Sequence, residues 1–250
     1  MSKGTQTREM IVARAAQLFN RQGYFGSSLS DIMEETGLEK GGIYNHFASK
    51  EQLALEAFDY AFGLHQKRIQ ELLAGKRHAV ERLLAMLVYF QDIVEDPLIA
   101  GGCPILNTAV EANDIHPALR DRARAAMDSL RDTMERIVLR GIERHELRLG
   151  IDASACATLF IAMLEGAVML SRLYDDPAHM RRAVEYLKGY IETSLREESV
   201  NSWKPALSLS SGAQANRFFP EPVAGKGEDS GSSERDPLML VLMRPGDYRA

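Results

Sequence analysis

Cysteine and proline are scarce in this chain of 250 residues, and long apolar runs are missing. Two cysteines, Cys103 and Cys156, are too few for a disulfide framework, so a reducing cytoplasm is the simplest setting. No run of 18 apolar residues occurs, and the first residues include no apolar segment. We therefore expect neither a transmembrane helix nor a signal peptide, and no membrane partner.

Basic charge is also in short supply. The formal net charge is −5, from 30 basic and 35 acidic side chains, which taken alone argues against binding to nucleic acid. The acidity is not uniform, because residues 1–50 hold six basic and five acidic side chains whereas residues 51–197 hold 18 and 23. The N-terminal part is therefore nearly neutral, without a basic patch.

Only four prolines precede residue 198, and proline costs about 3 kcal/mol in a helix interior, so the long stretches between them favour helices. Period-two apolar alternation is absent, and the chain up to residue 197 is predicted to be all-α. The expected helices span about 7–22, 28–37, a short segment holding Ile43 and Phe47, 49–73, 77–95, 103–112, 117–145, 152–174 and 177–197. Residues 198–250, rich in Ser, Gly and Pro, are predicted to be a disordered tail, apart from the apolar run 238–243.

Residues 29–47 have helix-turn-helix spacing, with two short helices on either side of a turn at Gly37. The second of these helices presents Lys40, Gly41, Tyr44 and Asn45 outward at i,i+4 spacing. Lys suits phosphate, Tyr suits phosphate or a thymine methyl group, and Asn suits an adenine edge. A helical hairpin without nucleic acid is the alternative from spacing alone.

Residues 8–62 resemble the N-terminal domain of TetR-family transcriptional regulators. The matching positions are Ala16, Leu18, Phe19, Gly23, Tyr24, Leu29, Asp31, Ile32, Thr36, Gly37, Leu38, Lys40, Gly41, Ile43, Tyr44, His46, Phe47, Ser49, Lys50, Glu51 and Leu53. The resemblance implies a helix-turn-helix DNA-binding domain at 1–50, a linking helix at 50–73, and a helical effector-binding and dimerisation domain at 74–197. It implies double-stranded operator DNA and a small-molecule effector as partners.

The same resemblance assigns roles within the DNA-binding domain. Ser28, Tyr44 and Lys50 would contact phosphates, and Lys40 would contact phosphate or a guanine edge. The positions that occupy or flank the groove-facing side are Gly41, Gly42, Asn45 and His46. Two residues depart from the family pattern, which often has Ser in place of Glu39 and Thr, Ser or Ala in place of Gly42. Glu39 is poorly placed beside a phosphate. The glycine pair Gly41 and Gly42 removes possible base contacts, and each glycine costs about 1 kcal/mol of helix propensity.

In the second domain, effector specificity must come from side chains between helices. The candidate ligand-lining residues are Met86, Tyr89, Phe90, Asn107, Met127, Met134, Phe160, Met163 and Tyr174. Methionine and aromatic side chains make adaptable apolar walls, although residues at helical spacing are more often plain core.

Cys103 lies between Gly102 and Pro104, at an expected helix N-terminus. The helix dipole there lowers a thiol pKa, so one interpretation of Cys103 is a thiol sensor of oxidants or electrophiles, and a small packed residue is the alternative. Cys156 is expected to be inert core. The histidines and cysteines have no metal-ligand spacing, and no nucleotide or catalytic motif is present, so we predict no metal, no cofactor and no enzyme activity.

The helices expected at 152–174 and 177–197 are the predicted dimer interface, since Ala155, Ala162, Gly166 and Ala167 permit close helix approach beside Met163 and Leu170. The favoured function is a cytoplasmic homodimeric repressor that binds a near-palindromic operator and is released by a small effector. Two alternatives are an all-α protein-interaction module without DNA binding and a thiol-based sensor acting through Cys103.

Overall fold

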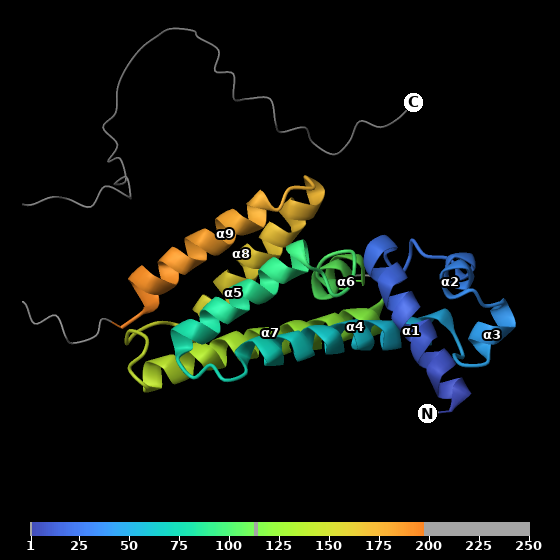
Figure 1. Ribbon diagram of the computed structural model, residues 1–250, viewed down its shortest axis with the longest axis horizontal. Helices are drawn as coiled ribbons and strands as arrows, with labels where there is room; N and C mark the ends of the chain where they lie inside the picture. Colours follow the sequence, from blue (N-terminus) through green and yellow to red (C-terminus); the bar gives the residue numbers. More distant parts are fainter. Residues whose placement is uncertain (1, 113–114, 198–250) are drawn as a thin grey trace, which may run out of the picture. The chain divides into compact units, whose positions relative to one another are not determined.

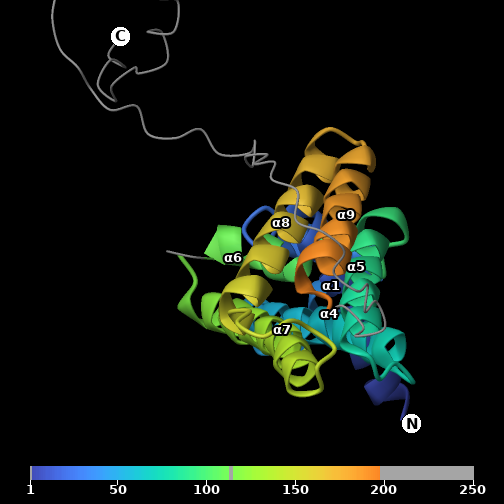
Figure 2. The ribbon, with the colours of Figure 1, turned by 90° about the vertical axis from the view of Figure 1, so that its left-hand side faces the viewer.

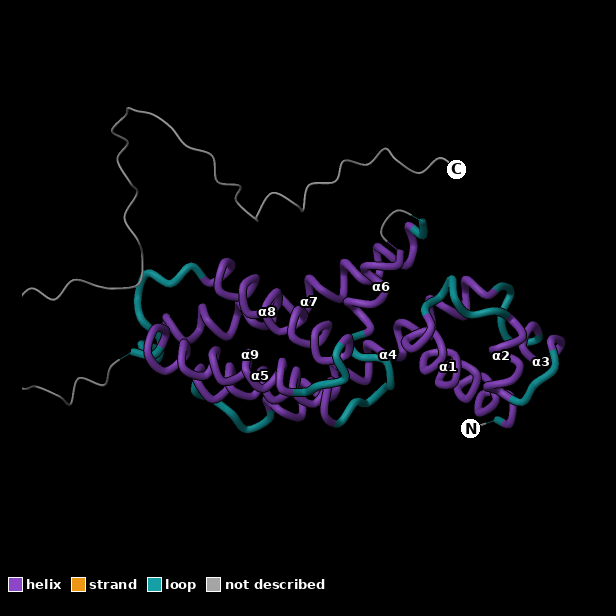
Figure 3. The backbone as a smooth tube through the Cα atoms, turned by 90° about the horizontal axis from the view of Figure 1, so that it is seen from above, coloured by secondary structure: helices purple, strands orange, loops and turns teal. Residues whose placement is uncertain are grey.

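The computed structural model describes residues 2–112 and 115–197, and within these ranges the chain is helical without a β-strand (Figure 3). The elements are α1 (Lys3–Gln22), α2 (Leu29–Thr36), α3 (Lys40–Tyr44), α4 (Lys50–Leu73), α5 (Ala79–Glu95), α6 (Pro104–Ala112), α7 (Pro117–Glu143), α8 (Ala153–Leu173), α9 (Ala178–Tyr190) and a π-helical turn at Ile191–Leu195. The all-α prediction is therefore confirmed. The predicted disordered tail at 198–250 and its apolar run lie outside the described residues.

Most helix boundaries match the expected ones, and the differences have local causes. Helix α1 begins four residues early because Ser2 Oγ accepts a hydrogen bond from Thr5 N and caps the helix. Helix α3 ends at Tyr44, so Asn45 and His46 follow it rather than continue it. The last helix gives way to a π turn after Tyr190 instead of running unbroken to residue 197.

Helices α1 to α3 pack on the first half of α4 around one apolar core (Figure 1). Its fully buried members are Ile11, Ala15, Ala16, Leu18, Ile32, Ile43, Phe47, Leu53, Ala57, Ala61 and Ile99. Ile32 on α2 and Ile43 on α3 hold the two short helices against α1. Each such side chain contributes about 1.5–3 kcal/mol when buried, which offsets the low intrinsic stability of helices this short.

A second, larger core lies between α5, α7, α8 and α9. Tyr89, Phe90 and Phe160 are its largest fully buried side chains. Figure 2 shows α8 beside α9 and α7 beside α4, and both pairs are in contact. Helix α4 joins the cores, because Leu53 belongs to the first while Phe58 and Ile69 belong to the second.

Helix α8 is the one described helix long and apolar enough to cross a membrane by length and composition. Half of its most apolar stretch is nevertheless buried, against α5, α7 and α9. This burial is typical of the core helix of a globular domain.

Substitution of Gly141 tests the packing of α5 against α7. A Cβ atom there would lie 2.6 Å from Ala79 Cβ and 2.7 Å from Leu147 Cγ, so Gly141→Ala should lower the free energy of unfolding by about 1–3 kcal/mol. Gly63 on α4 is the control, because its Cβ would meet nothing within 4 Å and Gly63→Ala should raise stability by up to ~1 kcal/mol. Urea denaturation of both variants measures this, and equal effects would contradict the described packing.

Candidate nucleic-acid interface

The turn into α2 is fixed by a reciprocal pair of hydrogen bonds. Asp31 N donates to Ser28 Oγ at 3.1 Å, and Ser28 N donates to Asp31 Oδ2 at 2.6 Å. The Ser28 backbone donation lowers the pKa of the Asp31 carboxyl. Gly37 ends α2 in the left-handed conformation, with φ of 68°, which glycine adopts without a Cβ penalty. The α2–α3 turn is therefore rigidly specified by sequence.

Helix α3 carries its polar side chains on the exposed side. Lys40, Tyr44 and Asn45 are exposed, while Ile43 is buried beneath them. The Lys40 ammonium lies 5.8 Å from the centre of the Tyr44 ring, so the two side chains share one patch. Lys and Tyr together present donors to phosphate, and Asn45 adds an amide at the helix end.

The two glycines of α3 face different surroundings. A Cβ on Gly41 would meet nothing within 4 Å, so Gly41 faces open space. A Cβ on Gly42 would contact the Leu38 side chain at 3.5 Å, so Gly42 faces the α2–α3 turn rather than a groove. His46 is half-buried, with its ring 6.5 Å from that of Phe47. The outward patch therefore consists of Lys40, Gly41, Tyr44 and Asn45.

Lys50 is engaged within the protein. Its Nζ donates to the backbone oxygen of Tyr24 at 2.6 Å and lies 4.2 Å above the centre of the Tyr24 ring. Partial burial lowers the pKa of Lys50, while the nearby Glu111 and Asp31 carboxylates oppose that shift. In this conformation Lys50 holds the loop after α1, and contact with a phosphate requires it to exchange this partner.

Helix α6 meets the loop after α1 through a carboxylate that the sequence analysis missed. Glu111 accepts hydrogen bonds from the backbone N–H groups of Tyr24 and Phe25, each at 2.8 Å. One turn earlier on α6, Asn107 Nδ2 donates to the Asn20 backbone oxygen at 3.1 Å. A glutamate near a helix C-terminus gives no sequence signal of such a role, because its partners are 87 and 86 residues away.

The nine candidate effector residues do not surround one common cavity. Those in the second core are Met86, Tyr89, Phe90, Met134 and Phe160, with Met127 partly buried against them. Met163 and Tyr174 are 39% and 62% exposed, so these two candidates lie outside the second core. Asn107 borders an open groove between α1, α6 and α8. Methionine and aromatic residues occupy both faces of a helix, which is why residue type alone did not separate them.

Buried polar side chains lie inside the second core. Cys103 Sγ donates to Glu165 Oε1 at 3.0 Å, and Tyr89 Oη lies 3.2 Å from His65 Nδ1. Glu165 Oε2 and His65 Nε2 are buried and have no hydrogen-bond partner among the described residues. We call these four residues the core polar cluster. Glu165 has one available sequence signal, since it is the sole charged residue between Asp152 and Arg172.

Burial controls the titration of this cluster. It raises the pKa of Glu165 to about 7 and lowers the pKa of His65 to about 4, so burial favours the neutral form of both side chains. The expected lowering of the Cys103 pKa is wrong. Cys103 is buried, and burial together with Glu165 raises the pKa of its thiol well above the usual value, which outweighs the helix dipole. Burial also raises the pKa of Cys156, to about 11.

The fold and the exposed face of α3 define a helix-turn-helix DNA-binding protein. The family model for bacterial regulatory proteins of the tetR family matches residues 11–57, and the model for the tetracyclin repressor-like C-terminal domain matches residues 79–187. The chain belongs to the TetR family. It is a DNA-binding transcriptional regulator, and members of this family are not enzymes.

Individual relatives agree with this assignment. The crystal structure of a TetR transcriptional regulator from Chloroflexus aurantiacus is 49% identical, with a TM-score of 0.77, over 79% of this chain and 100% of that one. The HTH-type transcriptional regulator LmrA of Bacillus subtilis is 31% identical over 68% of this chain and 88% of its own length. The HTH-type transcriptional repressor DhaR of Mycobacterium sp. is 27% identical over 68% of this chain and 84% of its own length.

The buried carboxyl of Glu165 gives a pH prediction. The folded state holds the proton more tightly than the unfolded chain, so this stabilisation is present below about pH 4.5 and is lost as pH rises through about 7. The wild-type free energy of unfolding should fall by up to ~3 kcal/mol over that range relative to Glu165→Gln. Urea denaturation at several pH values measures the difference, with the exposed Glu143→Gln as control. Parallel pH profiles for wild type and Glu165→Gln would contradict it.

Proposed function

We propose that this regulator is a homodimeric repressor, in which two copies of α3 read a near-palindromic operator. The observation that carries the proposal is the outward patch of Lys40, Tyr44 and Asn45 on a helix fixed by buried Ile43. Successive half-sites lie about 34 Å apart on one face of DNA, so two recognition helices are needed to reach both. The near-neutral N-terminal domain gives little non-specific attraction and depends on these placed contacts and on the dimer. The similarity to DhaR, a transcriptional repressor, favours repression.

The dimer interface that we propose is the outer face of α8 and α9. On α8, Ala155, Leu159, Ala162, Met163 and Leu173 are exposed at helical spacing, and Leu159 and Leu173 are 65% and 70% exposed. On α9, Tyr186 and Tyr190 are exposed as well. An apolar stripe of this extent, with small residues between the large ones, suits close packing against a second copy. Ala167 is buried in the chain's own core and takes no part in this face.

The core polar cluster is the effector region that we propose. Two of its polar atoms are unpaired, and an unpaired buried polar group costs about 1–3 kcal/mol, which a hydrogen-bonding ligand would recover. Cys103 precedes α6 at its N-terminus, and Glu111 on α6 holds the loop after α1. A ligand that displaces the Cys103–Glu165 contact would therefore move α6, and with it the helix-turn-helix. The regulator then leaves the operator to the extent that the ligand binds more tightly to the arrangement with α6 displaced than to the DNA-binding arrangement.

We further propose the domain division 1–50, 50–73 and 74–197 as functional units, and a cytoplasmic location. The matched segments 11–57 and 79–187 support the division, since α4 lies between and across them. Burial of half of the apolar stretch of α8 supports a protein outside the membrane.

Selection of bound DNA from a random library tests operator binding and symmetry at once. The selected sequence should be a near-palindrome, and Tyr44→Ala with Asn45→Ala should weaken its binding by about a hundredfold or more, at ~1–3 kcal/mol per lost contact. Tyr60→Ala is the matched control, because Tyr60 on α4 is 40% exposed against 41% for Tyr44. Fluorescence anisotropy measures affinity, and gel filtration checks that the dimer is intact. If the double variant binds the selected operator as tightly as wild type does, the proposed interface is wrong.

The α6 junction is tested by Glu111→Gln. An amide oxygen replaces only one of the two acceptors, so the Tyr24 and Phe25 amides should exchange with solvent about tenfold faster, and operators with altered half-site spacing should be discriminated less well. Hydrogen exchange and anisotropy measure the two effects, with Glu143→Gln as control. If exchange rises while spacing discrimination stays at the wild-type level, α6 does not set the position of the helix-turn-helix.

A further inference from the structure

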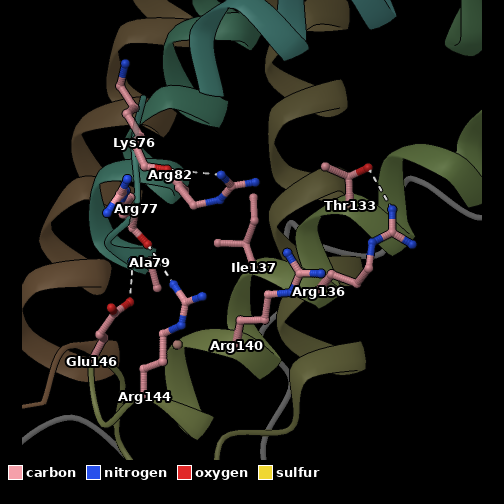
Figure 4. Close-up of a pocket in the computed structure, with 11 residues that line it drawn as sticks. Lys76, Arg77, Ala79, Arg82, Thr133, Arg136, Ile137, Arg140, Arg144 and Glu146 are labelled. Atoms are coloured by element: carbon pink, nitrogen blue, oxygen red, sulfur yellow. Dashed lines mark hydrogen bonds between the residues drawn. The ribbon is translucent and has the colours of Figure 1, made fainter. Parts of the chain in front are cut away.

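A cavity of about 280 Å³ lies between the start of α5 and the last turns of α7 (Figure 4). Its lining includes six cationic side chains: Lys76, Arg77, Arg82, Arg136, Arg140 and Arg144. Figure 4 shows Arg82 on one side of the cavity and Arg140 and Arg144 on the other. Glu146 is the one acidic residue among the lining residues. We call these six residues the cationic pocket.

The cations of this pocket are not neutralised by the described part of the chain. None of the six forms an ion pair with a residue of 2–112 or 115–197. Their hydrogen bonds go to neutral groups, since Arg82 Nη1 donates to the Lys76 backbone oxygen at 3.1 Å and Arg144 Nη1 to that of Arg77 at 3.2 Å. Glu146 Oε2 accepts from Ala79 N at 2.6 Å, so this carboxylate satisfies the first turn of α5.

Arg82 lies among like charges. Partial burial lowers the pKa of Arg82, and the like charges of Arg140 and Arg144 lower it further. Bringing an anion into the cavity would remove this repulsion. The cavity thus combines a partly open space, a multiple positive charge and hydrogen-bond donors that lack an acidic partner among the described residues.

We propose that the cationic pocket binds a small ligand that carries two or more phosphate groups. Five of the six cations are arginines, whose planar guanidinium groups match phosphate oxygens in a two-bond geometry. A single phosphate group carries about two negative charges near neutral pH and would leave most of the six cations unpaired. A diphosphate carries more charge and contacts several of these cations at once. The volume of about 280 Å³ is just below the usual range of about 300–1,000 Å³ for small-molecule sites, which favours a compact ligand.

This site is separate from the proposed DNA interface. Helix α4 has 24 residues and is about 36 Å long at 1.5 Å per residue. The helix-turn-helix precedes its first residue, and Lys76 comes three residues after its last one. The cationic pocket and α3 are thus attached to opposite ends of one long helix, so the pocket is a second anion site and not an extension of the first.

The test measures binding of pyrophosphate to the full-length protein by isothermal titration calorimetry. Wild type should bind pyrophosphate at least about tenfold more tightly than orthophosphate or citrate. The double variant Arg82→Gln with Arg140→Gln should bind pyrophosphate about tenfold or more weakly than wild type does. The control is Arg124→Gln with Arg131→Gln, which changes two exposed arginines of α7 outside the pocket and should stay within about twofold of wild type. Operator affinity without pyrophosphate should be equal in all three proteins.

Without ligand, the double variant Arg82→Gln with Arg140→Gln should be at least as heat-stable as wild type, because the substitutions remove repulsion between like charges. Thermal denaturation measures this. Arg140→Gln alone, at an exposed position, is the second variant should the double one fold poorly. The proposal is overturned if wild type does not bind pyrophosphate, if citrate binds more tightly, or if the pocket variants bind pyrophosphate as well as wild type. A loss of operator affinity in the pocket variants would instead assign these arginines to DNA.

Discussion

The described structure depends on helix α4 burying two of its faces in two different cores. Leu53, Ala57 and Ala61 complete the core of the three N-terminal helices, while Phe58 and Ile69 enter the core of α5, α7, α8 and α9. Most of the stability of a helix in a protein comes from tertiary packing rather than from propensity, so each core stabilises the helix that the other core also uses. The DNA-binding helices are therefore supported by the same element that anchors the second domain.

Besides α4, a set of polar contacts through α6 connects the second core to the N-terminal helices. The N-terminus of α6 lies at the Cys103–Glu165 hydrogen bond inside the second core, and its C-terminal turn supplies Glu111 to the loop after α1. Apolar packing tolerates small shifts, but a carboxylate that accepts two backbone N–H groups has one favourable position. This difference makes α6 the element best suited to transmit a change in the core to the helix-turn-helix.

Charge is distributed in a way that the net value conceals. The N-terminal domain is nearly neutral and exposes a few polar side chains at α3, whereas the acidic second domain contains the cationic pocket. The pocket forms because the segment that holds Lys76 and Arg82 folds against Arg136 and Arg140 of α7 and against Arg144, which follows that helix. The two proposals together give this regulator two anion-binding surfaces, one for a long polymer and one for a compact ligand.

The sequence by itself determined the features that depend on neighbours along the chain. The helix positions, the capping pair of Ser28 and Asp31, the turn at Gly37 and the match to the TetR family all rest on spacing within a few residues. Tertiary structure decided the rest. The Cys103 pKa rises because the core buries the thiol beside Glu165, 62 residues away. Met163 is exposed because it lies on the outward side of α8, and Tyr174 is exposed just after that helix ends. Glu111 and the six cations of the pocket acquire their roles only when distant helices meet, since desolvation and electrostatic attraction depend on distance in space and not along the chain.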